Sequence, residues 1–143
     1  MKGPAMRVLV VENDVSLAES MKRLIERWGH QAEGGVGGKD ALRMFKASPY
    51  DLVLMEVCLP DMKGYEFIRE LKGFSAETWI VTMTDVNSRE LELQIREEGV
   101  LYYMVKPFEA KSLKSLLDHL SRRSGMLGKA VPWNGFLEQA PHP

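Results

Sequence analysis

Polar side chains suited to chemistry stand at the ends of four short apolar runs of this sequence. They are Glu12 and Asn13, then Glu56, then Thr84, and finally Lys106 followed by Pro107. In an open parallel sheet, ligands bind outside the carboxyl ends of the strands, where the strand order reverses. Two carboxylates, an amide, a hydroxyl and an ammonium would therefore converge on one small pocket. Any one of these residues alone is explained as a solvent-facing strand end, so the prediction depends on their joint placement.

The spacing of apolar residues predicts the elements that would position this pocket. Short apolar or β-branched runs indicate strands at 7–11, 51–57, 79–83 and 101–105, with a weaker, more polar strand at 31–35. Apolar residues at helical spacing indicate helices at 17–28, 39–46, around 67–71, at 88–98 and around 113–120. Strands that alternate with helices imply right-handed βαβ units. We therefore predict an α/β fold, a three-layer, doubly wound domain with a parallel five-stranded sheet.

The length of 143 residues is that of one domain. We assign residues 6–123 to this domain and residues 124–143 to a tail or linker, because the end of the chain is rich in Gly and Pro and has no sustained period. The tail is more apolar than a spacer requires, notably at Trp133 and Phe136. We still expect it to be dispensable for folding.

Composition excludes several classes of function. Lys and Arg number 19 against 20 Asp and Glu, which argues against a broad basic face for nucleic acid. The single cysteine, Cys58, cannot form an intrachain disulfide, and three scattered histidines make no ligand cluster. No apolar stretch approaches the roughly 18 residues needed to cross a bilayer, and no export signal is visible. We expect a cytoplasmic protein that binds neither nucleic acid nor membrane.

Four separated segments resemble the receiver domain of two-component response regulators, the CheY-like family. They are VLVVEND, YDLVLMEVCLPDMKGYEF, IVTMTD and YYMVKPF, in the family's order and spacing across about Met6 to Arg123. The resemblance implies the flavodoxin-like, CheY-like (βα)5 fold. In that family a strand-three Asp accepts a phosphoryl group from a histidine kinase, and two acids after strand one help to hold Mg²⁺.

The resemblance also assigns expected roles to individual positions. Thr84 and Lys106 match the hydroxyl and the lysine that contact the phosphoryl oxygens, and Tyr103 matches the aromatic switch position. Lys106-Pro107 matches a cis peptide that aims the lysine into the site. The backbone carbonyl of Cys58 matches a metal ligand.

Two positions depart from the family pattern. Glu56 stands where the family has the phosphoaccepting Asp, and Asn13 stands where it usually has a metal-binding Asp. An amide in place of a carboxylate removes one charge from the metal shell, and Glu moves its carboxylate outward by about 1.5 Å. Because phosphoryl transfer depends on positioning and charge neutralisation, we expect it to be lost or very weak. Mg²⁺ binding would be weak at most, with Glu12, Asn13, Glu56 and the Cys58 carbonyl as the candidate ligands.

Glu56 has two open interpretations. Its carboxylate could project toward Thr84 and Lys106 and partly imitate a phosphorylated Asp, with about one negative charge against nearly two. Alternatively, it pairs with Lys106 and locks one conformation.

The competing function is a phosphorylation-competent receiver that accepts a phosphoryl group from a histidine kinase with Mg²⁺, at Glu56 or at a nearby Asp. For Asp61, Asp51 and Asp85 we expect turn chemistry, strand-entry capping and loop solvation instead. A phosphoryl-enzyme hydrolase of the haloacid-dehalogenase type is disfavoured, because VVEND lacks its DxDxT run. We therefore expect a signalling module and no enzyme.

The resemblance places the output surface on the fourth helix, the fifth strand and the fifth helix. Charges of both signs occur along this stretch, which suits a specific protein partner or a homodimer. A merely solvated face is the alternative. The expected partners are a histidine kinase or an effector protein.

Overall fold

The computed structural model describes residues 3–86 and 88–124 of the chain. Within these ranges, five parallel strands form one sheet in the order β2-β1-β3-β4-β5. The strands are β1 (Arg7–Val11), β2 (Gln31–Gly35), β3 (Leu52–Glu56), β4 (Trp79–Thr84) and β5 (Tyr102–Val105). The helices are α1 (Val15–Arg27), α2 (Gly38–Ala47), α3 (Gly64–Phe74), α4 (Arg89–Glu97) and α5 (Ala110–Ser124).

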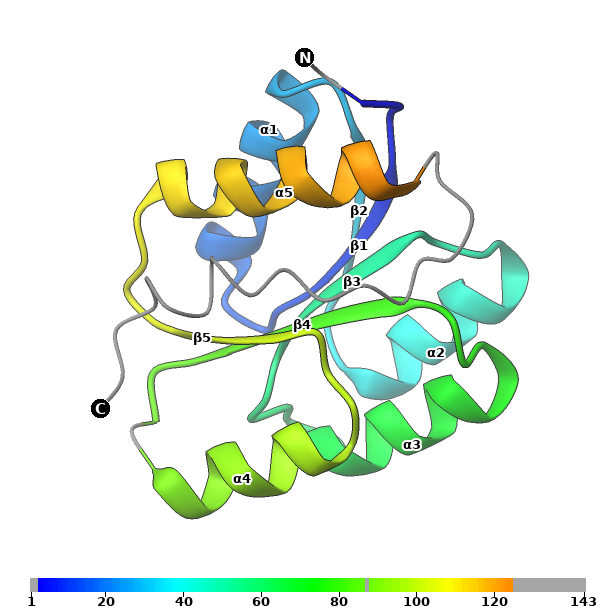
Figure 1. Cartoon of the computed structure of the whole chain (residues 1–143). Coiled ribbons are helices and arrows are strands. Elements are labelled where there is room, and N and C mark those ends of the chain that lie inside the picture. The colour runs from blue at the N-terminus through cyan, green and yellow to red at the C-terminus, as the bar shows by residue number, and fades with distance from the viewer. Residues whose placement is uncertain (1–2, 87, 125–143) are drawn as a thin grey trace.

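The helices cover both faces of the sheet, which confirms the predicted three-layer α/β fold (Figure 1). Helices α1 and α5 pack on one face together with Val8 and Val10 of β1. Helices α2, α3 and α4 pack on the other face with Leu9 and Val11. Because successive side chains of a strand point to opposite faces, a strand covered on both sides needs an unbroken apolar run. This is why VLVV carries no polar alternation.

Local sequence signals explain where α1 and α4 begin and where α1 ends. The Asp14 carboxylate accepts the Leu17 N–H at 3.1 Å, and the Ser88 hydroxyl accepts the Leu91 N–H at 3.2 Å. Both are N-caps, which satisfy backbone donors that a helix cannot satisfy itself. Past the end of α1, Gly29 has φ of 96°, the left-handed conformation that favours glycine.

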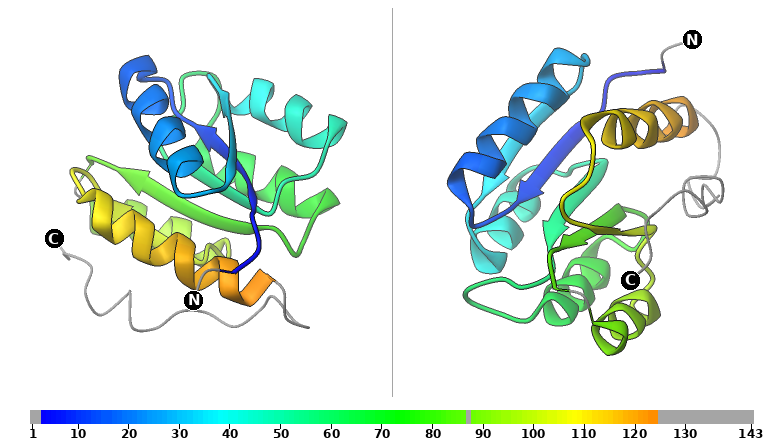
Figure 2. Two further views of the ribbon diagram at one scale, coloured as in Figure 1. Left: turned by 90° about the horizontal axis from the view of Figure 1, so that it is seen from above. Right: turned by 90° about the vertical axis from the view of Figure 1, so that its left-hand side faces the viewer.

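The start of the described chain packs on the end of α5. The Ser121 hydroxyl donates to the Pro4 carbonyl, and Met6 is 1% exposed in the core. A Cβ on Gly3 would come within 2.5 Å of the Ser121 backbone, so the close approach requires glycine. Figure 2 shows the blue first segment beside the orange end of α5.

Ser124 is the last residue of α5. The rest of the predicted tail, residues 125–143, lies outside the described residues. That the tail is dispensable for folding therefore stays a prediction. Among the described helices, none has the length and apolar character needed to span a membrane.

Candidate functional site

Strand order brings three of the predicted site residues together at the carboxyl edge of the sheet. Glu12 follows β1, Glu56 ends β3 and Lys106 follows β5. Glu12 is 3% exposed and Glu56 is 5% exposed, although both are charged types. Acidic side chains are rarely buried unless they are paired, so each requires a partner.

Lys106 is the partner of both acids. Its Nζ donates to Glu12 Oε1 at 2.6 Å and to Glu56 Oε1 at 2.6 Å. Burial acts to lower the pKa of Lys106, but the hydrogen bonds to the two carboxylates outweigh it and raise the pKa above its ordinary value. The lysine therefore stays protonated, and these three residues, named here the Glu-Lys-Glu triad, hold two anions around one cation.

The remaining carboxylate oxygens of the triad bind backbone N–H groups. Glu12 Oε2 accepts from the Asp14 N–H at 3.0 Å, and Glu56 Oε2 accepts from the Cys58 N–H at 2.9 Å. Each of the four carboxylate oxygens thus has a donor. A new ligand of these oxygens would have to displace an existing one.

Other predicted site residues lie near the triad without joining it. Thr84 is fully buried, and its hydroxyl accepts the Val86 N–H at 3.1 Å and lies 4.0 Å from Cys58 Sγ. Asn13 is exposed at the surface. The Lys106-Pro107 peptide is cis, as the resemblance predicts.

Tyr103 is buried beside α4. It is 3% exposed, and the guanidinium of Arg96 lies over its ring at 5.7 Å from the centroid. The hydroxyl is buried with no hydrogen-bond partner among the described residues. Burial raises the pKa of Tyr103 to about 12. The ring at the expected switch position is therefore turned into the protein.

The other aspartates examined as acceptor candidates have different surroundings. Asp51 Oδ2 accepts the Arg7 N–H at 2.8 Å, which agrees with the expected capping of a strand entry. Asp85 is exposed.

Asp61 does more than shape its own turn. Its carboxylate accepts the N–H groups of Gly38 at 2.8 Å and Lys39 at 2.9 Å, and so caps α2 from the β3–α3 loop. These bonds, first that of Lys39, lower the pKa of Asp61. Sequence reasoning missed this role because the cap and the helix are separated by more than twenty residues.

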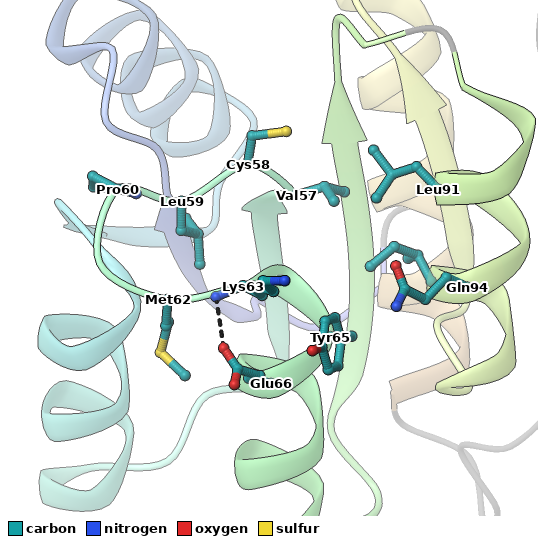
Figure 3. Close-up of a pocket in the computed structure, with 12 residues that line it drawn as sticks. Val57, Cys58, Leu59, Pro60, Met62, Lys63, Tyr65, Glu66, Leu91 and Gln94 are labelled. Carbon is teal, nitrogen blue, oxygen red and sulfur yellow. Dashed lines mark hydrogen bonds between the residues drawn. The ribbon is translucent and has the colours of Figure 1, made fainter.

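A hollow of about 530 Å³ lies between the β3–α3 loop and α4, next to the triad. Leu91 and Gln94 of α4 face Tyr65 of α3 across it, and Cys58 points away from it (Figure 3). No pattern in the sequence predicts this hollow. In the described part of the chain, no cluster of three or more His, Cys, Asp or Glu side chains could hold a metal ion.

Comparison with known proteins identifies the family. Residues 8–118 match the family described as the response regulator receiver domain. The chain therefore belongs to the receiver domains of response regulators, which act in two-component signalling. Receiver domains are signalling modules that interact with histidine kinases and effector domains.

Curated relatives are longer than this chain. It is 29% identical over 125 residues to the transcriptional regulatory protein ZraR of Salmonella typhimurium, covering 87% of this chain and 28% of that protein. It is 30% identical over 122 residues to the transcriptional regulatory protein DltR of Streptococcus agalactiae, covering 85% and 54%. The chain thus spans between about a quarter and a half of these relatives.

Solved structures share the fold. The chemotaxis response regulator CheY4 of Vibrio cholerae has a TM-score of 0.74 at 24% identity, covering 81% of this chain and 98% of that one. The signal receiver domain of a histidine kinase from Syntrophus aciditrophicus has a TM-score of 0.77 at 24% identity, covering 90% and 98%.

Proposed function

We propose that this receiver domain works without phosphorylation, because Glu56 occupies its own acceptor pocket. The observation that carries the proposal is the saturation of the Glu56 carboxylate, which binds Lys106 through one oxygen and the Cys58 N–H through the other. An acceptor carboxylate must present a free oxygen to the phosphoryl donor. Here both oxygens are engaged, and Glu56 as a residue is 5% exposed.

Both interpretations of Glu56, partial mimicry of a phosphorylated Asp and a lock, place its carboxylate on Lys106, so the contact that distinguishes them is the one to Thr84. In the family the strand-five lysine contacts a phosphoryl oxygen, and the Glu56 carboxylate makes that contact itself at 2.6 Å. Among the described residues, Glu56 makes no hydrogen bond to Thr84. The Thr84 hydroxyl instead accepts the Val86 N–H. Glu56 supplies about one negative charge against nearly two for a phosphate. The mimicry therefore extends to the lysine and not to the threonine.

The residues of the pocket do not fit Mg²⁺. A hard divalent cation needs several free oxygen ligands in near-octahedral arrangement. Glu12 and Glu56 already share the Lys106 ammonium, and Asn13 contributes a neutral amide in place of a charge. We propose that Mg²⁺ binding is weak or absent.

The surface proposed for output consists of α4, β5 and α5. Tyr103 lies within this surface, because it is buried in β5 and Arg96 of α4 lies over its ring. Charged residues of both signs are exposed on α4 and α5, which suits a protein partner rather than nucleic acid. An effector protein, a histidine kinase or a second copy of the chain are the partners proposed for it.

Incubation with acetyl phosphate and millimolar Mg²⁺, followed by intact-mass measurement, tests the proposal. The wild-type chain should gain no phosphoryl group, because Glu56 is occupied and the metal shell is incomplete. The double variant Asn13→Asp with Glu56→Asp should gain one, since Thr84 and Lys106 are already in place. Asn13→Asp alone is the matched control and should remain unlabelled. A stoichiometric, base-labile phosphoryl group on the wild-type chain would contradict the proposal and favour the phosphorylation-competent receiver.

A further inference from the structure

Two buried hydroxyl groups of the candidate site lack a strong hydrogen-bond acceptor. Thr84 is fully buried, and among the described residues the acceptor for its hydroxyl proton is Cys58 Sγ, a long contact of 4.0 Å to a weak acceptor. The Tyr103 hydroxyl is buried with no partner in the described part of the chain, and the residue is 3% exposed. Buried polar groups are normally satisfied, so these two donors require an explanation.

Tyr103 and Thr84 point to the same face of the sheet. In the β4–β5 register Tyr103 lies opposite Thr82, and Thr84 is two residues further along β4. Because side chains two apart on a strand share a face, the two hydroxyl-bearing residues are neighbours on that face.

The Tyr103 hydroxyl also lies near the sulfur of Cys58. Burial is the main cause that raises the pKa of Tyr103 to about 12, and interaction with Glu92 is the next. Cys58 and then Glu56 act in the same direction. Since electrostatic interactions weaken with distance, both pocket residues are close to the hydroxyl.

Cys58 is accessible from solvent. It is the single cysteine of the chain, and its side chain is exposed. Its N–H donates to Glu56 Oε2 at 2.9 Å, which fixes the backbone beside the triad. Figure 3 shows the side chain directed away from the hollow under α4. The sulfur therefore contacts the Thr84 hydroxyl and remains open to small solutes.

We infer that Cys58 is an oxidation site, at which a peroxide converts the thiol to a sulfinate whose oxygens accept hydrogen bonds from Thr84 and Tyr103. The modification completes the phosphoryl mimicry that Glu56 begins. The inference therefore rests on the proposed function and names the regulation of the same site.

The oxidation takes two steps, and each consumes one hydrogen peroxide. The sulfur lone pair forms an S–O bond as the O–O bond of the peroxide breaks, so sulfur loses two electrons and the peroxide gains them. The thiol proton leaves in the water that is released, and the first product is a sulfenic acid, which is reversible. A second peroxide adds the second oxygen in the same way, and the sulfinic acid ionises to the sulfinate.

The geometry at Thr84 fits an added oxygen. The 4.0 Å between Cys58 Sγ and Thr84 Oγ1 exceeds an O–H···O bond of about 2.7 Å by roughly one covalent bond length. An oxygen bonded to the sulfur thus reaches the hydroxyl, and supplies the threonine contact that Glu56 does not make.

The charge also fits. Glu56 supplies about one negative charge against nearly two for a phosphate, and a sulfinate at Cys58 supplies the second. Cys58 is exposed, so water solvates the part of the sulfinate that the two hydroxyls do not bind.

Peroxide treatment of the full chain tests the inference. Excess hydrogen peroxide should add two oxygens to the peptide that contains Cys58, and tandem mass spectrometry separates them from oxygens on the nine methionines. Tyr103→Phe should slow sulfinate formation about fivefold, because the hydroxyl stabilises the negative oxygen that forms. Tyr102→Phe removes a hydroxyl on the opposite face of β5 and is the matched control, with an unchanged rate.

A charge variant tests the consequence without peroxide. Cys58→Asp places two carboxylate oxygens on the atom that follows Cβ, as in the sulfinate. Its amide shifts in an NMR spectrum should extend to Thr84 and Tyr103 and match those of the oxidised wild type. Cys58→Ser adds no charge and is the matched control, with shifts confined to the loop around residue 58.

Three results would each overturn the inference. They are a Cys58 thiol that stays reduced under conditions that oxidise free cysteine, an oxidation rate unaffected by Tyr103→Phe, and Cys58→Asp shifts that extend no further than those of Cys58→Ser. Phosphoryl labelling of the reduced chain decides the proposed function separately, so the two failures are distinguishable.

Discussion

Each edge of the sheet carries a polar cluster built around one cation, and the two clusters differ in burial and in the partners of the cation. At the carboxyl edge, Lys106 joins Glu12 and Glu56, and all three side chains are at most 15% exposed. At the amino edge, Arg7 donates to the Ser48 hydroxyl at 2.5 Å and the Pro49 carbonyl at 2.6 Å.

Solvent access differs between these clusters. Arg7 also approaches Glu33 at 3.5 Å, with side chains 33% and 55% exposed, so water can replace either partner. Water has little access to the triad, where a lost partner leaves a charge buried and uncompensated. We therefore expect the loss of the cation to reduce stability more at the carboxyl edge than at the amino edge.

Removing Lys106, the cation shared by Glu12 and Glu56, should lower the stability of the protein most. Lys106→Met leaves two carboxylates buried without their cation, and should lower the free energy of unfolding by about 3 to 5 kcal/mol. Urea denaturation at pH 7 measures this loss. Lys111→Met is the control, because its side chain is 80% exposed and its removal should change stability little. A loss below about 1 kcal/mol for Lys106→Met would remove the distinction between the two edges.

Removing the corresponding cation at the amino edge should cost less. Arg7→Met loses charge-assisted hydrogen bonds to neutral groups and a cation–π contact with the Tyr50 ring at 4.5 Å. Because water can solvate the groups left behind, we expect a loss of about 1 to 2 kcal/mol in the same denaturation measurement. A loss equal to that of Lys106→Met would show that burial is not the deciding variable.

Asp61 tests whether burial or position at the carboxyl edge determines the loss of stability, because it lies at that edge and is exposed. Asp61→Ala removes the cap of α2 and should cost about 1 kcal/mol at pH 7. The pKa of Asp61 is lowered in the folded protein, so its contribution is present above its unfolded pKa of about 4 and is lost as the pH falls through the folded value. The difference between wild type and variant should therefore shrink in denaturation curves measured at acid pH. A difference that grows at acid pH would contradict this assignment.

Removing the hydroxyl of Tyr103 or of Tyr50 should change the stability of the protein least. Tyr103→Phe removes a buried hydroxyl that has no partner in the described chain, so stability should stay within about 0.5 kcal/mol or rise slightly. Tyr50→Phe removes a hydrogen bond to Glu33 and should cost about 1 kcal/mol. Thermal unfolding of both variants measures the difference. Equal losses would indicate that Tyr103 has a partner in the folded protein.

Local signals in the sequence were sufficient to predict the fold. The apolar run at 7–11 gives β1 with the predicted bounds, and Asp14 caps α1. The predicted helix at 17–28 is observed at Val15–Arg27, a shift at the boundary where capping competes with periodicity.

The site was less accessible to sequence reasoning. Strand ends predicted that Glu12, Glu56 and Lys106 would meet, because parallel strands end at one edge. The sharing of one ammonium by both acids could not be predicted, since it depends on side-chain conformations across up to 94 residues. The cap from Asp61 and the pairing of Arg7 with the loop before β3 were missed for the same reason.

The packing of Gly3 and Pro4 on Ser121 has a consequence for protein engineering. The first described residues lie beside the end of α5, away from the triad. Adjacent ends are the condition under which a domain tolerates circular permutation or insertion into a host loop. A short Gly-Ser linker from Ser124 to residue 3 would close the described residues into a ring. New ends opened in an exposed loop would then leave the Glu-Lys-Glu triad intact.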